Sequence, residues 1–167
     1  MVFTLWKLHG HTQVTKFAGG PYISLDGKVH QLDLLTGRSM QRDGDLAITV
    51  GRDPLIVRNF SRYMWSATIE MQGGGFAPYD RDIEYPNEAP VDGYQPQIVI
   101  EMPVTATHWS GEFDHSYYFK KGPTFGRITF HIFTGFDDPP VIGVGYTGCI
   151  NPEGSRNLEI PGSDAPP

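Results

Sequence analysis

Cysteine is almost missing from this sequence, and a membrane-length apolar run is missing altogether. The 167 residues include one cysteine, Cys149, so no internal disulfide can form. No apolar run approaches the roughly 20 residues that span a bilayer, which argues against membrane insertion. Residues 1–7 lack the charged-then-apolar build of a signal peptide. The expectation is either an intracellular protein or a segment of a longer secreted or cell-surface bacterial protein, and the linker-like composition of residues 161–167 favours the second.

Positive charge is also scarce. The formal net charge is −6 and the pI is near 5.4, so the surface repels phosphate and nucleic acid is a poor partner. The densest basic spot, Lys120–Lys121 with Arg127 nearby, is too small to form a nucleic-acid surface. The same charge disfavours a membrane surface.

What the sequence does contain is enough for a core of short strands. Hydrophobic residues make up 39% and aromatic residues 13%, which a soluble globular domain can bury. The 20 glycines and 14 prolines are many for a helical protein but suit strands joined by tight turns.

Apolar and polar residues alternate over most of the chain, as they do in half-buried strands. The alternating segments are residues 46–50, 63–71, 109–120 and 128–133. The run Gln97–Val104 is more uniformly apolar and predicts a strand covered on both faces. Together the pattern predicts an all-β fold, an antiparallel β-sandwich of Ig-like or jelly-roll-like type with roughly eight or nine strands.

Turn residues divide the chain between these segments. Asp26-Gly27 predicts a type I′ hairpin between Tyr22–Leu25 and Lys28–Leu32. Gly73–Gly75 ends one strand, and the proline-rich segment Phe76–Pro96 is predicted to be one long irregular loop. We expect a single domain over residues 1–160, with residues 1–40 as an alternative separate β-hairpin extension and 161–167 as a flexible tail or linker.

The long loop is rich in aromatic and charged residues, a composition typical of carbohydrate recognition. Sugar rings stack their apolar faces on aromatic side chains, and neighbouring charged groups bind the hydroxyls. Tyr118 falls on the polar face of its strand and is expected to be exposed. The predicted ligand-binding residues are Tyr79, Arg81, Tyr85, Tyr94 and Tyr118.

The same loop carries a candidate calcium site. If the chain is extended there, Asp80, Asp82 and Glu84 project to one side, and carboxylate oxygens are the ligands that Ca²⁺ prefers. A solvated acidic loop is the alternative interpretation.

Catalytic and cofactor motifs are not found. Cys149 is interpreted as a small buried residue, since nothing near it in sequence lowers its pKa. His9-Gly10-His11 has a spacing that two metal-bound imidazoles can adopt, with His108, His115 and His131 as further candidates, but no second cluster completes a site. No spacing singles out a pair of carboxylates for acid–base catalysis.

The sequence therefore favours a non-catalytic accessory module that recognises carbohydrate through exposed aromatic residues. The first alternative is a structural or protein-interaction domain of a larger protein, marked by exposed apolar strand edges. The second alternative is a small β-fold enzyme acting on glycans or using a metal. Sandwich folds host many functions, so the step from fold to function is an analogy.

Overall fold

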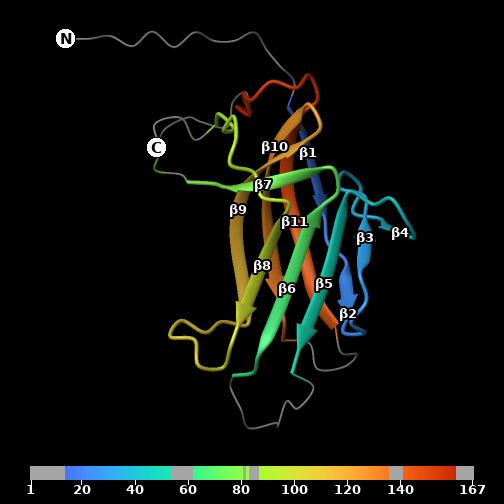
Figure 1. Cartoon of the computed structure of the whole chain (residues 1–167), viewed down its shortest axis with the longest axis vertical. Helices are drawn as coiled ribbons and strands as arrows, with labels where there is room; N and C mark the ends of the chain where they lie inside the picture. Colours follow the sequence, from blue (N-terminus) through green and yellow to red (C-terminus); the bar gives the residue numbers. More distant parts are fainter. Residues whose placement is uncertain (1–13, 54–61, 81, 83–86, 136–140, 161–167) are drawn as a thin grey trace, which may run out of the picture.

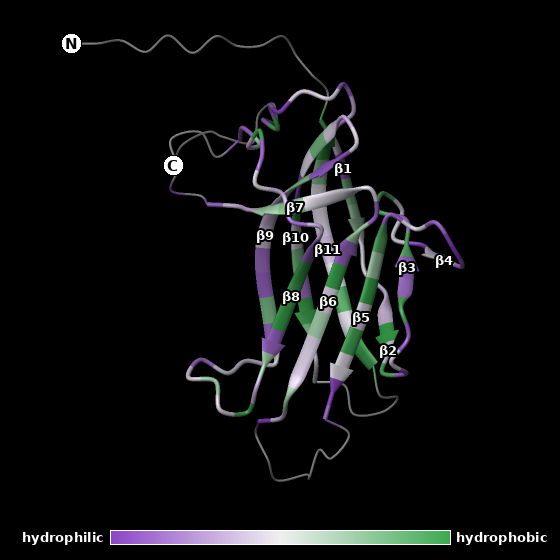
Figure 2. Cartoon of the chain, in the orientation of Figure 1, coloured by the Kyte–Doolittle hydropathy of each residue, from purple (hydrophilic) through white to green (hydrophobic). Residues whose placement is uncertain are grey.

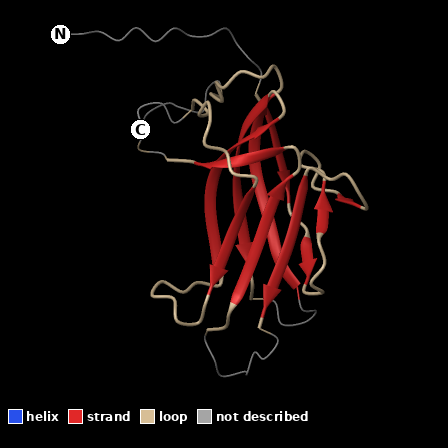
Figure 3. Ribbon diagram, viewed as in Figure 1, coloured by secondary structure: helices blue, strands red, loops and turns tan. Residues whose placement is uncertain are grey.

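Eleven strands form the regular structure of this computed structural model, which describes residues 14–53, 62–80, 82, 87–135 and 141–160. The strands are β1 (Thr15–Gly19), β2 (Tyr22–Ser24), β3 (His30–Leu32), β4 (Ser39–Met40), β5 (Leu46–Arg52), β6 (Trp65–Met71), β7 (Gly74–Pro78), β8 (Gln97–Met102), β9 (Glu112–Lys121), β10 (Thr124–Phe133) and β11 (Val141–Asn151). Within the described ranges only strands and loops are present (Figure 3). A helix able to span a membrane is not found there.

The strands form two antiparallel sheets that face each other (Figure 1). Sheet A has the order β1-β11-β10-β9-β7, with β2 also paired to β11, and sheet B has the order β4-β3-β5-β6-β8. The predicted all-β sandwich is confirmed. The strand number is higher than the expected eight or nine, because β7 lies in the segment predicted as a turn and an irregular loop, and β4 has only two residues, too few for alternation to be recognised.

The core lies between the sheets and follows the alternation of the sequence. In β6, Trp65, Ala67, Ile69 and Met71 are buried while the residues between them are more exposed. In β10, Ile128, Phe130 and Ile132 point into the same core. Figure 2 shows hydrophobic and hydrophilic residues mixed along the strands of both sheets, as expected when one face of each sheet meets solvent.

The predicted Asp26-Gly27 hairpin is wrong. β2 pairs with β11 in sheet A, whereas β3 pairs with β5 in sheet B, so the chain changes sheets at this turn. Gly27 has a φ of 69°, but Asp26 is not among the residues with positive φ, as a type I′ turn requires. Instead, the Asp26 carboxylate accepts the Lys28 N–H at 3.0 Å. Residues 14–40 thus contribute strands to both sheets.

The chain changes sheets again between β6 and β7, where Figure 1 shows β7 running across the end of sheet B. Gly73 has a φ of 70° there, and a Cβ at Gly74 would lie 2.2 Å from the Lys120 carbonyl oxygen, so glycine is needed at both positions. The end of the preceding strand at these glycines is confirmed. The predicted irregular loop begins later than expected, because Phe76–Pro78 belong to β7.

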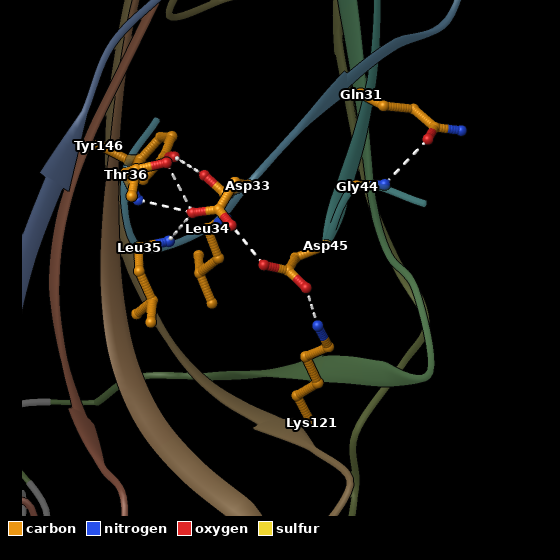
Figure 4. Close-up of polar contacts among 9 residues, drawn as sticks. All are labelled: Gln31, Asp33, Leu34, Leu35, Thr36, Gly44, Asp45, Lys121 and Tyr146. Atoms are coloured by element: carbon orange, nitrogen blue, oxygen red, sulfur yellow. Dashed lines mark hydrogen bonds and ion pairs between the residues drawn. The ribbon is translucent and has the colours of Figure 1, made fainter. Parts of the chain in front are cut away.

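Polar contacts connect sheet B to the end of β9 (Figure 4). Asp45, just before β5, accepts the Leu34 N–H at 2.9 Å and forms an ion pair with Lys121 at the end of β9. On the same side, the Gln31 side-chain oxygen accepts the Gly44 N–H at 3.0 Å. These contacts hold the segment between β3 and β5 in place.

The strand predicted from Gln97–Val104 is present as β8, but the expectation that both of its faces are covered is wrong. β8 is the last strand of sheet B and pairs only with β6 in the described structure. Its inward residues Ile98 and Ile100 are buried, whereas Val99 on the outer face is 55% exposed.

Candidate functional site

Three of the residues predicted to bind a ligand, Tyr79, Tyr94 and Tyr118, pack at the outer face of sheet A. Tyr118 is only 2% exposed, so the expectation of an exposed ring is wrong. The Tyr79 ring meets it edge-on, with centroids 5.2 Å apart. Tyr94 is partly buried, donates its hydroxyl proton to the Pro90 carbonyl at 2.9 Å and lies against Phe125. Burial raises the pKa of both Tyr94 and Tyr118 to about 12.

Arg127 connects the Tyr79 ring to Asn87. Its guanidinium lies 5.1 Å from the centre of the Tyr79 ring and donates to the Tyr79 hydroxyl oxygen at 3.2 Å. It also donates to the Asn87 side-chain oxygen at 3.2 Å. These contacts give Tyr79 a structural role. The ligand-binding roles of Tyr79 and Tyr94 remain predictions, and those of Arg81 and Tyr85 lie outside the described residues.

The cover over Tyr118 comes from two segments that are distant in sequence. Leu158 is fully buried, and its N–H donates to the Asn87 carbonyl at 2.8 Å. It belongs to a second core, separate from the one between the sheets, whose buried residues are Ala77, Ala89, Tyr118, Phe125, Cys149 and Leu158. Arg156 donates to the Ala89 carbonyl at 2.9 Å and forms an ion pair with Glu88. We call residues 152–160 the C-terminal cover, since they close one end of the outer face of sheet A.

The candidate calcium ligands are described only in part. Asp82 lies in a turn, and its N–H donates to the Asp80 carboxylate at 2.9 Å, so this pair does not have the extended geometry on which the site was predicted. Glu84 lies outside the described residues. Among those that are described, no three histidine, cysteine or carboxylate side chains are close enough to hold a metal ion.

Cys149 is buried, as expected, and burial raises the pKa of its thiol. A thiol that keeps its proton is a poor nucleophile. The arrangement therefore supports the interpretation of Cys149 as a packing residue of the second core.

The exposed part of the outer face of sheet A carries a different set of aromatic residues. Tyr22 on β2 and Phe133 on β10 both lie directly opposite Gly143 on β11, so the three residues form one row across three strands. Tyr22 is 68% exposed and Phe133 is 40% exposed. Strands lie about 4.8 Å apart, so the two rings start from backbones about 10 Å apart, separated by a residue without a side chain.

Polar groups occupy the next row on the same face. His131 on β10 lies opposite Asp114 on β9, and its Nδ1 contacts the Asp114 carboxylate. Both side chains are exposed. On the other side of His131, Gly145 leaves the surface open, because a Cβ there would meet only His131 atoms at 3.6 and 3.7 Å. We call Tyr22, Phe133, Gly143, Asp114 and His131 the aromatic platform.

Sequence reasoning missed the aromatic platform, although a signal was present. Phe133 shares the outward alternation phase of Thr129 and His131, where a large apolar side chain is unexpected. For Tyr22 the signal was weaker, because β2 is only three residues long. That both residues lie opposite Gly143 follows only from the strand pairing.

Comparisons with protein-family models, curated proteins and solved structures found no match to this chain. Function is therefore inferred from the chemistry of the surfaces described above.

Proposed function

We propose that this chain is a non-catalytic carbohydrate-recognition module that binds its glycan on the aromatic platform. The observation that carries the proposal is the row of Tyr22, Gly143 and Phe133, in which two residues with exposed rings lie opposite a residue with no side chain. A sugar presents an apolar C–H face that stacks on such rings. The glycine lets it approach the sheet between them.

The neighbouring row supplies the polar half of the recognition. The Asp114 carboxylate accepts hydrogen bonds from sugar hydroxyls, and the His131 Nε2, which faces away from the Nδ1 contact with Asp114, exchanges a further one. The net charge of −6 favours a neutral glycan over an anionic one. This location replaces the 76–96 loop as the centre of the proposed binding surface.

Binding to a glycan array and then to the selected oligosaccharide by calorimetry tests the proposal. Tyr22→Ala and Phe133→Ala should each weaken binding by about tenfold, because each removes one stacking surface. Tyr22→Phe keeps the ring and should lose little affinity.

Val91→Ala provides a control, because it trims an exposed apolar side chain away from the aromatic platform. It should bind as the unaltered chain does. Binding that survives both alanine substitutions, or the absence of binding to every glycan tested, would overturn the proposal.

A further inference from the structure

One long edge of sheet B is open in the described structure. β8 pairs with β6 on one side, and no described strand pairs with its other side (Figure 1). Unpaired strand edges present backbone donors and acceptors to any chain that can add a strand, so natural proteins usually block them.

The hydrogen-bond phase shows which residues of β8 face outward. The Met71 N–H donates to the Pro96 carbonyl at 2.9 Å, which makes these two residues a hydrogen-bonded pair. Because such pairs alternate, Ile98, Ile100 and Met102 bond to β6. The intervening residues, Gln97, Val99 and Glu101, therefore direct their N–H and C=O groups to the open edge.

The hydrogen-bond pattern between β5 and β6 agrees with this assignment. The Gln72 N–H donates to the Asp45 carbonyl at 2.9 Å, so the even-numbered residues of β6 bond to β5. The odd-numbered residues of β6 are left to bond to β8.

Two usual means of blocking an edge, proline and lysine, are missing from this strand, and Glu101 is its one charged residue. β8 has six residues with no proline or lysine among them, and Val99 at its centre is 55% exposed. Other outer strands are protected: β4 has two residues, β1 carries Lys16, and β7 is bridged at Phe76 by Gln95. β8 thus combines length, apolar character and an open side.

We propose that a second copy of this chain pairs with β8 in antiparallel fashion, with a two-fold axis at Val99. In this register Val99 lies opposite the same residue of the second copy, and Gln97 lies opposite Glu101. The three outward residues then exchange two hydrogen bonds at each pair. Ile98 lies opposite Ile100, so apolar residues meet apolar residues on the inner face.

Charge and proline disfavour the registers that are shifted in one direction. A shift of two residues in one direction places Gln97 opposite Pro103, which has no N–H to donate. A further shift sets Glu101 opposite its own copy, which places like charges together. Centred on Val99, each carboxylate instead faces an amide that can donate to it.

Sedimentation equilibrium over a range of protein concentrations tests the proposal. The unaltered chain should form dimers. Val99→Pro removes an outward N–H that β6 does not use, and proline is tolerated at such edge positions, so this variant should stay folded and monomeric.

Two charge variants test the register itself. Gln97→Lys places opposite charges at two symmetric pairs and should tighten the dimer by about fivefold at low salt, an effect that high salt removes. Gln97→Glu places like charges there and should weaken the dimer by a similar factor. Val104→Lys, at an exposed position beyond β8, provides the matched control and should change nothing.

Circular dichroism establishes that each variant is folded. A monomer at every concentration overturns the proposal, as does a dimer that survives Val99→Pro in a folded protein. If Val99→Pro fails to fold, the charge variants decide, and a shift of both in the same direction rules out this register.

Discussion

At the scale of single residues, Tyr146 shows how one polar contact fixes a loop to the core. Its ring is buried, and its hydroxyl donates to the Asp33 carbonyl at 3.1 Å (Figure 4). The Asp33 carboxylate accepts bonds from the Thr36 side chain and backbone, which lower its pKa. The folded state gains stability from this lowered pKa at every pH above the ordinary pKa of aspartate. The gain is lost as the pH falls through the lowered pKa of Asp33.

For Tyr146 we expect a loss of stability at high pH, in contrast to the loss at low pH expected for Asp33. Burial raises its pKa to about 12 from the ordinary 10.0, so the folded state resists ionisation of the phenol. The associated stability is fully present below pH 10 and is lost as the pH rises toward about 12. The free energy of unfolding, measured with urea across this range, should therefore fall.

Tyr146→Phe tests this effect and the hydrogen bond together. Loss of the bond to Asp33 should cost about 1 kcal/mol at neutral pH. The alkaline decrease should become shallower, although Tyr94 and Tyr118, whose pKa values are also raised to about 12, still contribute. Val91→Ala, at an exposed position, should stay within about 0.5 kcal/mol of the unaltered chain and keep the same alkaline slope. An unchanged alkaline slope in Tyr146→Phe would contradict the assignment.

At the scale of elements, the C-terminal cover acts as a separate packing unit on sheet A. Leu158 is its fully buried anchor, and Tyr118 and Cys149 lie in the same second core. The cover lies on the face of sheet A opposite the main core, so its loss leaves the contacts between the two sheets intact.

Leu158→Ala should lower the free energy of unfolding by about 3 kcal/mol, because it leaves a cavity in this core. Glu159→Ala, at the next and exposed position, should stay within about 0.5 kcal/mol of the unaltered chain. Chemical denaturation measures both changes. The Cys149 thiol should also react faster with a thiol reagent in Leu158→Ala, and unchanged reactivity would show that the cover does not protect it.

The alternation of apolar and polar residues was sufficient to predict the long strands, but not which strands pair with one another. Alternation at Trp65–Met71 specified both the strand and its buried face, because each side chain flips at every residue. The Asp26-Gly27 turn was assigned to a hairpin because turn residues specify a change of direction and not the sheet in which the next strand pairs. By alternation, Tyr118 lies on the polar face of its strand. Residues 152–160, which are 34 or more positions later in the sequence, nevertheless cover it.

The candidate site was harder to predict than the fold for the same reason. Tyr22 and Phe133 are far apart in sequence, and only their shared pairing with Gly143 brings them into one row. The openness of β8 likewise depends on which strands pair, since its apolar run alone indicated a covered strand.

At the scale of the whole molecule, the aromatic platform and the β8 edge lie on different sheets. The aromatic platform is on the outer face of sheet A, whereas β8 ends sheet B. Pairing through β8 would join two copies of sheet B and leave both platforms uncovered. A dimer of this kind would therefore carry two copies of the proposed glycan site.

The two proposals together predict a gain in avidity. Val99→Pro should leave the affinity for a soluble monovalent oligosaccharide unchanged but should weaken retention on a dense glycan surface by about 100-fold. Calorimetry and surface binding, measured on the same samples, separate the two effects. Equal retention of both proteins on the surface would show that the two sites do not act together.

The pairing of β1 with β11 also has a mechanical consequence. Thr15 lies opposite Ile150 and Gly19 lies opposite Tyr146, so the start of β1 and the end of β11 meet at one end of sheet A. Tension applied between Thr15 and Asn151 would open the hydrogen bonds of this pair one at a time, as in a zipper, instead of loading them in parallel. The sandwich is therefore expected to yield at low force when pulled in this direction, with β1 peeling away first and taking Phe17 out of the core between the sheets.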